Sequence, residues 1–344
     1  MKVFFVVPAP LSAVSGGYGY DRRIIAGLRD LGHEVEVAEM AGRHPHADEA
    51  ATAAARGVLD RAAADQRLVI DGLGLPAFAP FTDELERRGA VGLIHHPTAL
   101  EHGNPGPVRD ALRATEQAMF PRLARIIAPS EPMARRLPEE FGVDPARLGV
   151  VEPGTDRAER AAGSTAGGCA ILSVGALIPR KGHDVLLRAL ATLPDLQWHL
   201  TIAGGARDGT YATGLGALAE ELGIAQRVTL AGEVGAELEA LWQGTDLFAL
   251  ATYWEGYGMA VAEALARGIP LALTAGGAVA ELAPKAATVL VQPGDHAALG
   301  RAMRRPIFDA ALRAEMAEAA WQAGQRLPGW DTRAAAFADE LARA

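Results

Sequence analysis

The chain has 344 residues, 49% hydrophobic and 22% charged, a length that allows about two domains with sizeable cores. Its 39 glycines and 21 prolines follow no short period, which excludes collagen-like fibres and low-complexity disorder. The formal net charge of −9 has the wrong sign for a protein that binds the phosphate backbone of a nucleic acid, so no nucleic acid partner is expected.

Short apolar runs rich in β-branched residues alternate with longer amphipathic segments, a pattern typical of βα units around a parallel sheet. In the first half of the chain, strands are predicted at Lys2–Val7, Glu34–Glu39, Leu68–Asp71, Ala90–His95, Arg125–Ala128 and Gly149–Val151. The clearest helices between them are predicted at Tyr18–Leu31, Val108–Leu123 and Glu131–Phe141. We therefore expect a first Rossmann-like domain over residues 1–157.

The stretch Pro153–Gly168 is rich in small and charged residues without an apolar period, which is typical of a linker. The alternation then restarts, with strands predicted at Cys169–Gly175, Gln197–Ala203, Arg227–Ala231, Asp246–Leu250, Ile269–Leu273 and Thr288–Val291. A second Rossmann-like domain is expected over residues 168–327. The predicted fold class is α/β, with two doubly wound domains facing a cleft.

The C-terminal part is helical in pattern from Asp295 onward, with breaks predicted at Pro306 and at Pro328-Gly329. Residues 328–344 are expected to form a last helix, for which packing against the first domain is one arrangement. The longest uncharged run, Ala161–Pro179, contains too many Gly, Ser and Thr residues to span a membrane. The single cysteine, Cys169, excludes internal disulfides, and we expect a cytoplasmic protein without a transmembrane segment.

Ligands of open parallel sheets bind beyond the carboxyl ends of the strands, so the residues that follow each predicted strand are candidates for a site. In the first domain these are Ser15-Gly16-Gly17-Tyr18-Gly19 and His95-His96-Pro97. In the second domain they are Pro179-Arg180-Lys181-Gly182, Gly204-Gly205, Gly232-Glu233 and Trp254-Glu255-Gly256-Tyr257-Gly258. We expect these loops to line one cleft.

Several of these features also have a purely structural interpretation. Gly16-Gly17 is either a tight turn or backbone lying close to a ligand. Arg180-Lys181 is either an exposed pair or, between a strand end and a helix start, a neutraliser of phosphate. Asp71 is interpreted as a cap or turn former. His95-His96 is either a hydrogen-bonded strand end or half of a metal site, and no metal is predicted because no Cys or acidic ligand stands at the usual spacing.

The most specific motif is the pair of glutamates in Glu255-Gly-Tyr-Gly-Met-Ala-Val-Ala-Glu263. A helix beginning near Gly258 leaves Glu255 just before its N-terminus and puts Glu263 about a turn and a half inside it. One carboxylate can then bind a sugar and the other a ribose, while the helix dipole favours phosphates between them.

Taken together, these residues resemble the retaining nucleotide-sugar glycosyltransferases of family four, which have the GT-B fold. The resemblance covers nearly the whole chain and is carried by Gly16-Gly17, His95, Ala128-Pro129-Ser130-Glu131, Pro153-Gly154-Thr155-Asp156, Val174-Gly175, Lys181-Gly182-His183-Asp184, Ala203-Gly204-Gly205, Arg227–Gly232 and the Glu255/Glu263 pair. The chain departs from the family at Ala176, where members commonly carry Arg.

The resemblance implies transfer of a sugar from a nucleotide-diphosphate sugar to an acceptor hydroxyl, with retention of configuration. It implies that His95, Glu255 and Lys181 are catalytic, with Glu255 on the donor sugar, Lys181 on the diphosphate and Glu263 on the ribose. Because Ala176 replaces Arg, Arg180 is the nearest cation that could assist Lys181. The full predicted donor site is Gly16, Gly17, Arg180, Lys181, Gly204, Gly232, Glu233, Val234, Glu255, Gly256, Tyr257, Gly258, Met259 and Glu263.

The first domain is expected to bind the acceptor and the second the donor. No metal and no cofactor are expected, since the chain lacks an Asp-x-Asp motif and the nucleotide sugar is a substrate. The acceptor stays open among a sugar, a lipid-linked sugar and a small molecule. One alternative is a non-catalytic nucleotide-sugar-binding protein of the same fold. Another is a dinucleotide-dependent oxidoreductase, although the Gly17–Arg22 segment lacks the third small residue of the dinucleotide fingerprint.

Overall fold

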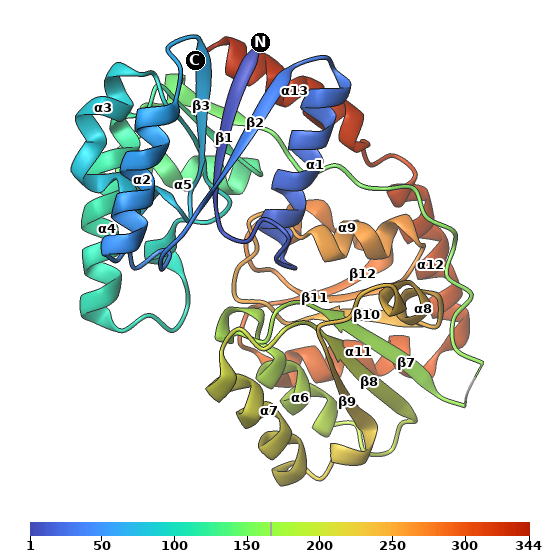
Figure 1. Ribbon diagram of the computed structural model, residues 1–344. Helices are drawn as coiled ribbons and strands as arrows, with labels where there is room; N and C mark the ends of the chain where they lie inside the picture. The colour runs from blue at the N-terminus through green and yellow to red at the C-terminus, as the bar shows by residue number, and fades with distance from the viewer. Residues whose placement is uncertain (166) are drawn as a thin grey trace. The chain divides into compact units, whose positions relative to one another are not determined.

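The computed structural model describes residues 1–165 and 167–344, and the chain divides into two units (Figure 1). Unit 1 comprises residues 1–154 and 330–344, and unit 2 comprises residues 155–329. Each unit is built on one six-stranded parallel sheet with helices, which confirms the predicted α/β class. Ala166, part of the predicted linker, lies outside the described residues.

The sheet of unit 1 has the strand order β2-β1-β3-β4-β5-β6. Its strands are β1 Lys2–Pro8, β2 Glu34–Met40, β3 Gln66–Asp71, β4 Val91–Leu93, β5 Arg125–Ala128 and β6 Leu148–Val150. Residues 3–7 of β1 are fully buried, as expected for a parallel strand covered on both faces. Strand β2 lies on one side of β1, and β3 to β6 lie on its other side. The point where the strand order reverses, the switch point, therefore lies between β1 and β3.

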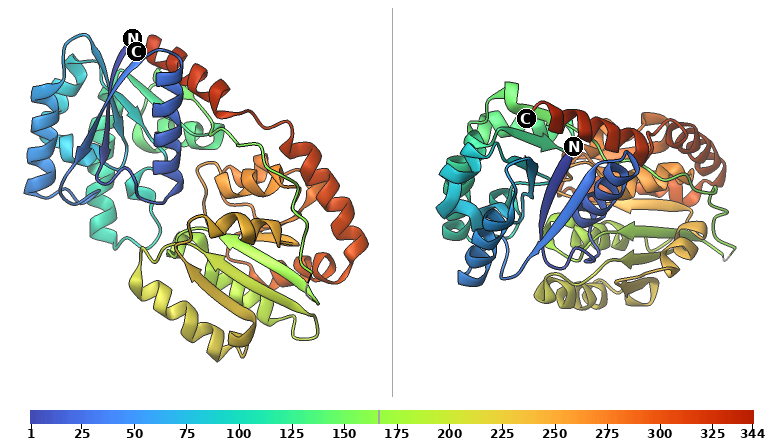
Figure 2. Two further views of the ribbon diagram at one scale, coloured as in Figure 1. Left: turned by 45° about the vertical axis from the view of Figure 1, so that its right-hand side comes forward. Right: turned by 45° about the horizontal axis from the view of Figure 1, so that its top comes forward.

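The last helix of the chain completes unit 1. The helices of this unit are α1 Gly16–Asp30, α2 Glu49–Arg61, α3 Thr82–Arg87, α4 Gly106–Met119, α5 Glu131–Phe141 and α13 Trp330–Ala342. Helix α13 lies beside α1 (Figure 2), and the Phe337 ring stacks on Phe5 of β1 with 6.3 Å between centroids. A strand at the start of the chain and a helix at its end therefore share one core.

The sheet of unit 2 has the order β12-β11-β10-β7-β8-β9. Its strands are β7 Cys169–Val174, β8 Trp198–Ala203, β9 Val228–Gly232, β10 Leu247–Leu250, β11 Leu271–Thr274 and β12 Thr288–Val291. Since β8 and β9 continue from one side of β7 and β10 to β12 lie on its other side, the switch point here lies between β7 and β10.

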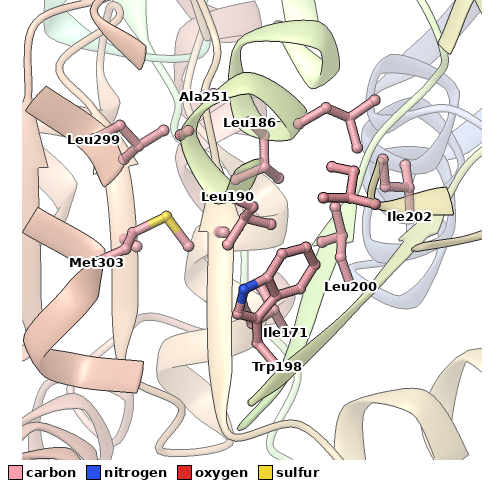
Figure 3. Packing of buried hydrophobic residues seen from close by; sticks show 14 of the residues in the cluster. Ile171, Leu186, Leu190, Trp198, Leu200, Ile202, Ala251, Leu299 and Met303 are labelled. Carbon is pink, nitrogen blue, oxygen red and sulfur yellow. The ribbon is translucent and has the colours of Figure 1, made fainter. Parts of the chain in front are cut away.

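Helices cover both faces of this second sheet. They are α6 His183–Ala191, α7 Gly209–Glu221, α8 Glu237–Gln243, α9 Met259–Ala266, α10 Val279–Leu282, α11 His296–Phe308 and α12 Ala310–Gly324. On one face, Leu186 and Leu190 of α6 and Met303 of α11 pack against strand residues such as Leu200 (Figure 3). On the other face, Trp242 of α8 and the apolar residues of α9 and α12 form a separate cluster.

Some predicted boundaries differ from the structure. Helix α11 continues through Pro306 and ends at Phe308, and Asp309 then caps α12 by accepting a hydrogen bond from the Leu312 amide. A proline near the end of a helix removes one donor without breaking the preceding turns, so the predicted break at Pro306 was wrong. Strand β4 stops at Leu93, before the predicted end at His95. Its neighbour β3 ends at Asp71, which pairs with Leu93. Strand β3 therefore has no further residue with which Ile94 or His95 could pair.

Backbone contacts hold the predicted linker against unit 2. The amide of Ala161 donates to the carbonyl oxygen of Arg267, and the amide of Gly163 donates to that of Gln243. Residues 151–165 contain no helix or strand, in agreement with their composition. Among the described residues, no helix is long and apolar enough to cross a membrane.

Candidate functional site

The switch point of unit 2 brings together two loops that the sequence analysis selected. One loop follows β7 and contains a short 3-10 turn, Pro179–Lys181, and the other follows β10 and leads to Glu255. Lys181 Nζ donates to Glu255 Oε1 at 2.5 Å, and Arg180 Nη1 lies 4.0 Å from the same oxygen. These side chains are between 10% and 16% exposed, so the ion pair is largely shielded from solvent. Three predicted site residues therefore form one cluster.

Close packing of the backbone positions this cluster. Gly182 has φ +61°, and a Cβ at this position would lie 2.1 Å from the carbonyl oxygen of Ala251 at the end of β10. A Cβ at Gly175 would lie 3.2 Å from Lys181 Cδ, so this glycine lets the lysine side chain lie across the end of β7. Arg180 in turn donates from Nη1 to the carbonyl oxygen of Trp254 at 2.8 Å. At Gly182 any side chain would clash with the backbone, whereas at Gly175 a side chain would require the Lys181 side chain to shift.

The charges in the cluster determine the ionisation of Glu255. Burial by itself raises the pKa of this carboxyl, but Lys181 and Arg180 favour the charged form and hold its pKa below the ordinary value. Thr252, fully buried, adds a hydrogen bond that lowers the pKa further. Glu255 is therefore an anion at neutral pH, able to accept hydrogen bonds from hydroxyl groups.

Glu263 lies in a different environment. It is the fifth residue of α9, which begins at Met259 after Gly258, whose φ is +103°. Burial raises the pKa of Glu263 to about 7, the nearby carboxylates Asp156 and Glu239 raise it as well, and Arg267 partly opposes them. Among the described residues, no hydrogen bond or ion pair links Glu263 to the Lys181–Glu255 pair. The pKa values of the two glutamates are thus shifted in opposite directions.

The other predicted donor residues lie along the same edge of the unit 2 sheet. Gly232 ends β9 with φ +69°, and its carbonyl oxygen accepts a hydrogen bond from the Gly204 amide at 2.8 Å. Glu233 is exposed beside Gly205, and Val234 packs on the apolar cluster under α8. Gly256 and the buried Tyr257 connect Glu255 to Gly258 and Met259, the start of α9.

Unit 1 contains a pocket of about 240 Å³ at its own switch point. The loop after β1, the ends of β3 and β4, and the segment that follows β4 contribute its polar lining, which includes Ser15, Asp71, His95, His96, Glu101 and Asn104. Both predicted histidines therefore line the same pocket. The short β4 leaves His95 in a turn, where its side chain is 21% exposed.

His95 is held by two carboxylates. Its Nε2 lies 2.9 Å from Oδ1 of the fully buried Asp21 and 3.5 Å from Oδ2 of Asp71. Burial alone lowers the pKa of His95, but Asp21 and Asp71 outweigh it and raise the pKa above its ordinary value. Burial, together with Asp21, raises the pKa of Asp71 to about 7. Asp71 also accepts a hydrogen bond from the Leu73 amide at 2.7 Å, which confirms it as a turn former.

Asp21 was not predicted from the sequence, because only acidic ligands at the usual spacing from His95-His96 were considered. Asp21 comes from α1, far from His95 along the chain, so the local spacing of metal motifs could not reveal it. One signal was available, because Asp21 lies on the apolar stripe of α1 with Tyr18, Ile25 and Leu28. The three side chains Asp21, Asp71 and His95 offer ligand atoms within 4.8 Å of one another.

Gly16 and Gly17 are the first two residues of α1 rather than part of the preceding loop. Ser15 caps this helix by accepting a hydrogen bond from the Tyr18 amide at 3.3 Å, which starts the helix earlier than the apolar pattern predicts. A Cβ at Gly17 would lie 3.2 Å from Cδ2 of His95. Gly17 therefore allows the His95 imidazole to lie against the N-terminus of α1. Gly16, Gly17 and His95 all belong to unit 1.

Comparisons with known proteins add a family context. A model described as Glycosyltransferase Family 4 matches residues 20–159, and one described as Glycosyl transferases group 1 matches residues 157–323. D-inositol 3-phosphate glycosyltransferase of Mycobacterium tuberculosis is 35% identical over 211 residues, which cover 55% of this chain and 43% of that protein. The match thus spans less than half the length of this curated relative.

Solved structures share the fold over almost the whole chain. Sucrose-phosphate synthase from Thermosynechococcus elongatus superposes with a TM-score of 0.83 at 18% identity, covering 98% of this chain and 97% of that chain. HepE from Anabaena, in complex with UDP-glucose, superposes with a TM-score of 0.78 at 19% identity. The match covers 100% of this chain and 100% of that chain. At these identities the likeness describes the fold.

Proposed function

The chain belongs to the family 4, group 1 glycosyltransferases with the GT-B fold, and from this premise we propose that it transfers a sugar from a nucleoside-diphosphate sugar to an acceptor hydroxyl. The observation that carries the proposal is the shielded cluster of Lys181, Arg180 and Glu255 at the switch point of unit 2. Such a cluster offers cations for a diphosphate and a carboxylate for sugar hydroxyls within one site.

In this proposal unit 2 binds the donor and unit 1 the acceptor. Lys181, assisted by Arg180, neutralises the leaving diphosphate, and Glu255 accepts hydrogen bonds from the donor sugar. Glu263 binds the ribose, and the Gly232–Val234 segment lies near the base. The buried ion pair supports these roles, because a diphosphate placed beside Lys181 brings its sugar next to Glu255.

The proposed chemistry is retaining and needs no metal ion. The bond between the anomeric carbon and the diphosphate oxygen breaks, and the bond to the acceptor oxygen forms on the same face. The departing phosphate takes up the acceptor proton, and His95 donates a hydrogen bond to the reacting acceptor in unit 1. Cations and helix-terminal amides can stabilise the leaving group in place of a metal.

A binding and turnover assay tests the proposal. UDP-glucose is the first donor to examine, because the HepE structure contains it. Replacing Lys181 removes a charge-assisted hydrogen bond, so Lys181→Ala should bind UDP about ten- to a hundredfold more weakly by calorimetry. Lys285→Ala, an exposed lysine in the same unit, is the matched control and should bind UDP normally.

Three results would contradict parts of this proposal. Equal UDP affinity in Lys181→Ala and the unmodified protein would remove Lys181 from the site, once circular dichroism has shown that the variant is folded. Loss of turnover in EDTA, with recovery on adding a divalent cation, would overturn metal independence. Binding of nucleotide sugars without transfer or hydrolysis would identify a non-catalytic binding protein.

A further inference from the structure

Helix α1 holds the His95 imidazole from one side. A Cβ at Gly17 would lie 3.2 Å from Cδ2 of the ring, and Oδ1 of Asp21 lies 2.9 Å from Nε2. The ring of Tyr20 meets the imidazole edge-on, with 5.0 Å between the centroids and 76° between the planes. Tyr20 and Asp21 follow Gly17 by three and four positions, and residues at this spacing lie on one face of a helix. The first turns of α1 therefore present one surface to the ring.

We propose that Asp21 is a positioning residue for the transfer reaction, which holds His95 by Nε2 so that Nδ1 is the imidazole nitrogen that contacts the acceptor. The inference rests on the proposed function, since it names the atom through which His95 acts there. Asp21 is fully buried and does not line the pocket of unit 1, whereas His95 does. Asp21 can therefore affect a substrate in the pocket only through another side chain.

Carboxylates occupy the Nε2 edge of the ring. Oδ1 of Asp21 lies 2.9 Å from this nitrogen, and Oδ2 of Asp71 lies 3.5 Å from it. A half-turn of the ring about its Cβ–Cγ bond would exchange Nε2 for Cε1 and remove a hydrogen bond from a fully buried carboxylate, which is costly. The contact with Asp21 therefore fixes which edge of the imidazole remains for a ligand.

The other nitrogen of the ring is open. Within residues 1–165 and 167–344, Nδ1 of His95 makes no hydrogen bond, and it does not belong to the side-chain atoms that are buried without a partner. The side chain is 21% exposed and lines the pocket. Since Nε2 faces Asp21 and Cδ2 faces Gly17, the exposed edge is the one with Nδ1 and Cε1. A hydroxyl group in the pocket can reach Nδ1 without displacing a hydrogen-bond partner from it.

The carboxylates also favour the form of the ring that can donate from Nδ1. Burial alone lowers the pKa of His95, but Asp21 and Asp71 outweigh it and raise the pKa above its ordinary value. A neutral imidazole that donates its Nε2–H group to Asp21 has no proton on Nδ1, whereas the imidazolium carries one on each nitrogen. The charged ring can thus donate to Asp21 and to the acceptor oxygen at the same time.

Two substitutions of His95 in the full chain test which nitrogen acts. The amide nitrogen of asparagine reaches about the position of Nδ1, and that of glutamine reaches about the position of Nε2. His95→Asn should therefore keep a donor for the acceptor, whereas His95→Gln should keep only the contact with Asp21. We measure kcat as UDP release from UDP-glucose, with glucose or, where glucose is not used, water as the acceptor. The value should be at least about tenfold higher in His95→Asn than in His95→Gln.

The stability of these two variants should follow the opposite order. His95→Gln should have the higher Tm, because its amide still donates to the buried carboxylate of Asp21. Both variants should bind UDP like the unmodified protein in calorimetry, since the donor site is proposed in unit 2. Equal kcat values in the two variants, or a higher value in His95→Gln, would overturn the assignment of Nδ1.

A double-mutant cycle tests the role of Asp21. Asp21→Asn removes the charge with little change of shape and should lower kcat about ten- to a hundredfold. In a His95→Ala background the same substitution should change kcat by less than about twofold, because Asp21 acts only through His95. Full activity of Asp21→Asn, or an equal loss in both backgrounds, would overturn the positioning role.

Glu340→Gln is the matched control. Glu340 of α13 is 8% exposed and pairs with Arg125 of the same unit rather than with His95. The substitution removes the same charge from another buried contact of unit 1, so it should lower Tm and leave kcat unchanged. A fall in kcat as large as that in Asp21→Asn would show that the loss of any buried carboxylate has this effect and would contradict the inference.

Nitrogen-15 NMR of the histidine side chains examines the contact without turnover. The His95 signals are those that are missing from His95→Gln. We expect Nε2 of His95 to carry a proton in the unmodified protein, and both ring signals to shift in Asp21→Asn but not in Glu340→Gln. Unchanged signals in Asp21→Asn would overturn the inference. The expected shifts in a protein that neither binds nor turns over nucleotide sugars would show that the proposed function has failed and the contact has not.

Discussion

Asp21 has a fully buried carboxylate beside a second buried carboxylate, Asp71, with His95 between them. Burial, and after it the charge of the neighbouring Asp21, raises the pKa of Asp71 to about 7. The two carboxylates and the imidazole form one cluster, in which Nε2 of His95 lies 2.9 Å from Asp21 and 3.5 Å from Asp71. It keeps His95 Nε2 directed at Asp21, so the orientation of the imidazole is set by a residue that does not line the pocket.

Glu263 provides a prediction about pH. Burial raises its pKa to about 7, so the carboxylate is largely ionised at pH 8 and largely protonated at pH 6. If it accepts hydrogen bonds from the ribose, UDP should bind the unmodified protein better at pH 8. The amide in Glu263→Gln does not ionise, so this variant should bind UDP about tenfold more weakly than the unmodified protein at pH 8. The difference in affinity between the two proteins should be smaller at pH 6.

Calorimetry of both proteins at the two pH values measures this effect. Since UDP titrates equally in both experiments, the ratio of the two dissociation constants isolates the contribution of Glu263. A ratio that does not change with pH would show that this carboxylate is not the group whose ionisation supports binding.

At the scale of elements, the contact between α1 and α13 depends on a glycine. A Cβ at Gly27 would lie 2.4 Å from the Cβ of Ala334, so the two helices approach more closely than two side chains permit. Gly27→Ala should therefore lower the free energy of unfolding by about 1–3 kcal/mol through overpacking. Urea unfolding followed by circular dichroism measures the change.

Gly57 of α2 is the matched control for this prediction. A Cβ at Gly57 meets no atom within 4 Å, and alanine favours a helix by about 0.5–1 kcal/mol over glycine. Gly57→Ala should therefore stabilise the protein slightly. If both variants were more stable than the unmodified protein, helix propensity rather than helix contact would determine the effect of Gly27→Ala.

For the molecule as a whole, the two units contain separate sheets and separate cores. A ligand that binds only unit 2 should protect that unit. At a UDP concentration a hundred times its Kd, amides of β7 and β10 that exchange through unfolding of unit 2 should slow by about a hundredfold. Amides of β1 and β3 in unit 1 should keep their rates, as measured by hydrogen exchange with mass spectrometry. Equal slowing in both sheets would show that the units unfold together.

The sequence alone determined the elements and their order. Buried parallel strands are continuous apolar runs and their helices are amphipathic, so strands such as Arg125–Ala128 and Thr288–Val291 could be located to the residue. It also placed Lys181 and Glu255 in loops after β7 and β10, because ligand-binding residues of such sheets follow the carboxyl ends of strands. Boundaries that depend on a neighbour, such as the end of β4, could not be obtained in this way.

Only the tertiary structure decided which of these residues meet. Strand order, which local patterns do not encode, makes β7 and β10 neighbours and joins Lys181 to Glu255 across 74 positions of the chain. It likewise brings Asp21 of α1 and Asp71 of β3 to His95, although each looks unremarkable in its own segment. The ionisation of these side chains was also decided only by the tertiary structure, because the pKa of a side chain depends on its burial and on charges from distant segments. The residue types and their positions on strands and helices were determined locally, whereas their contacts and charges required the folded molecule.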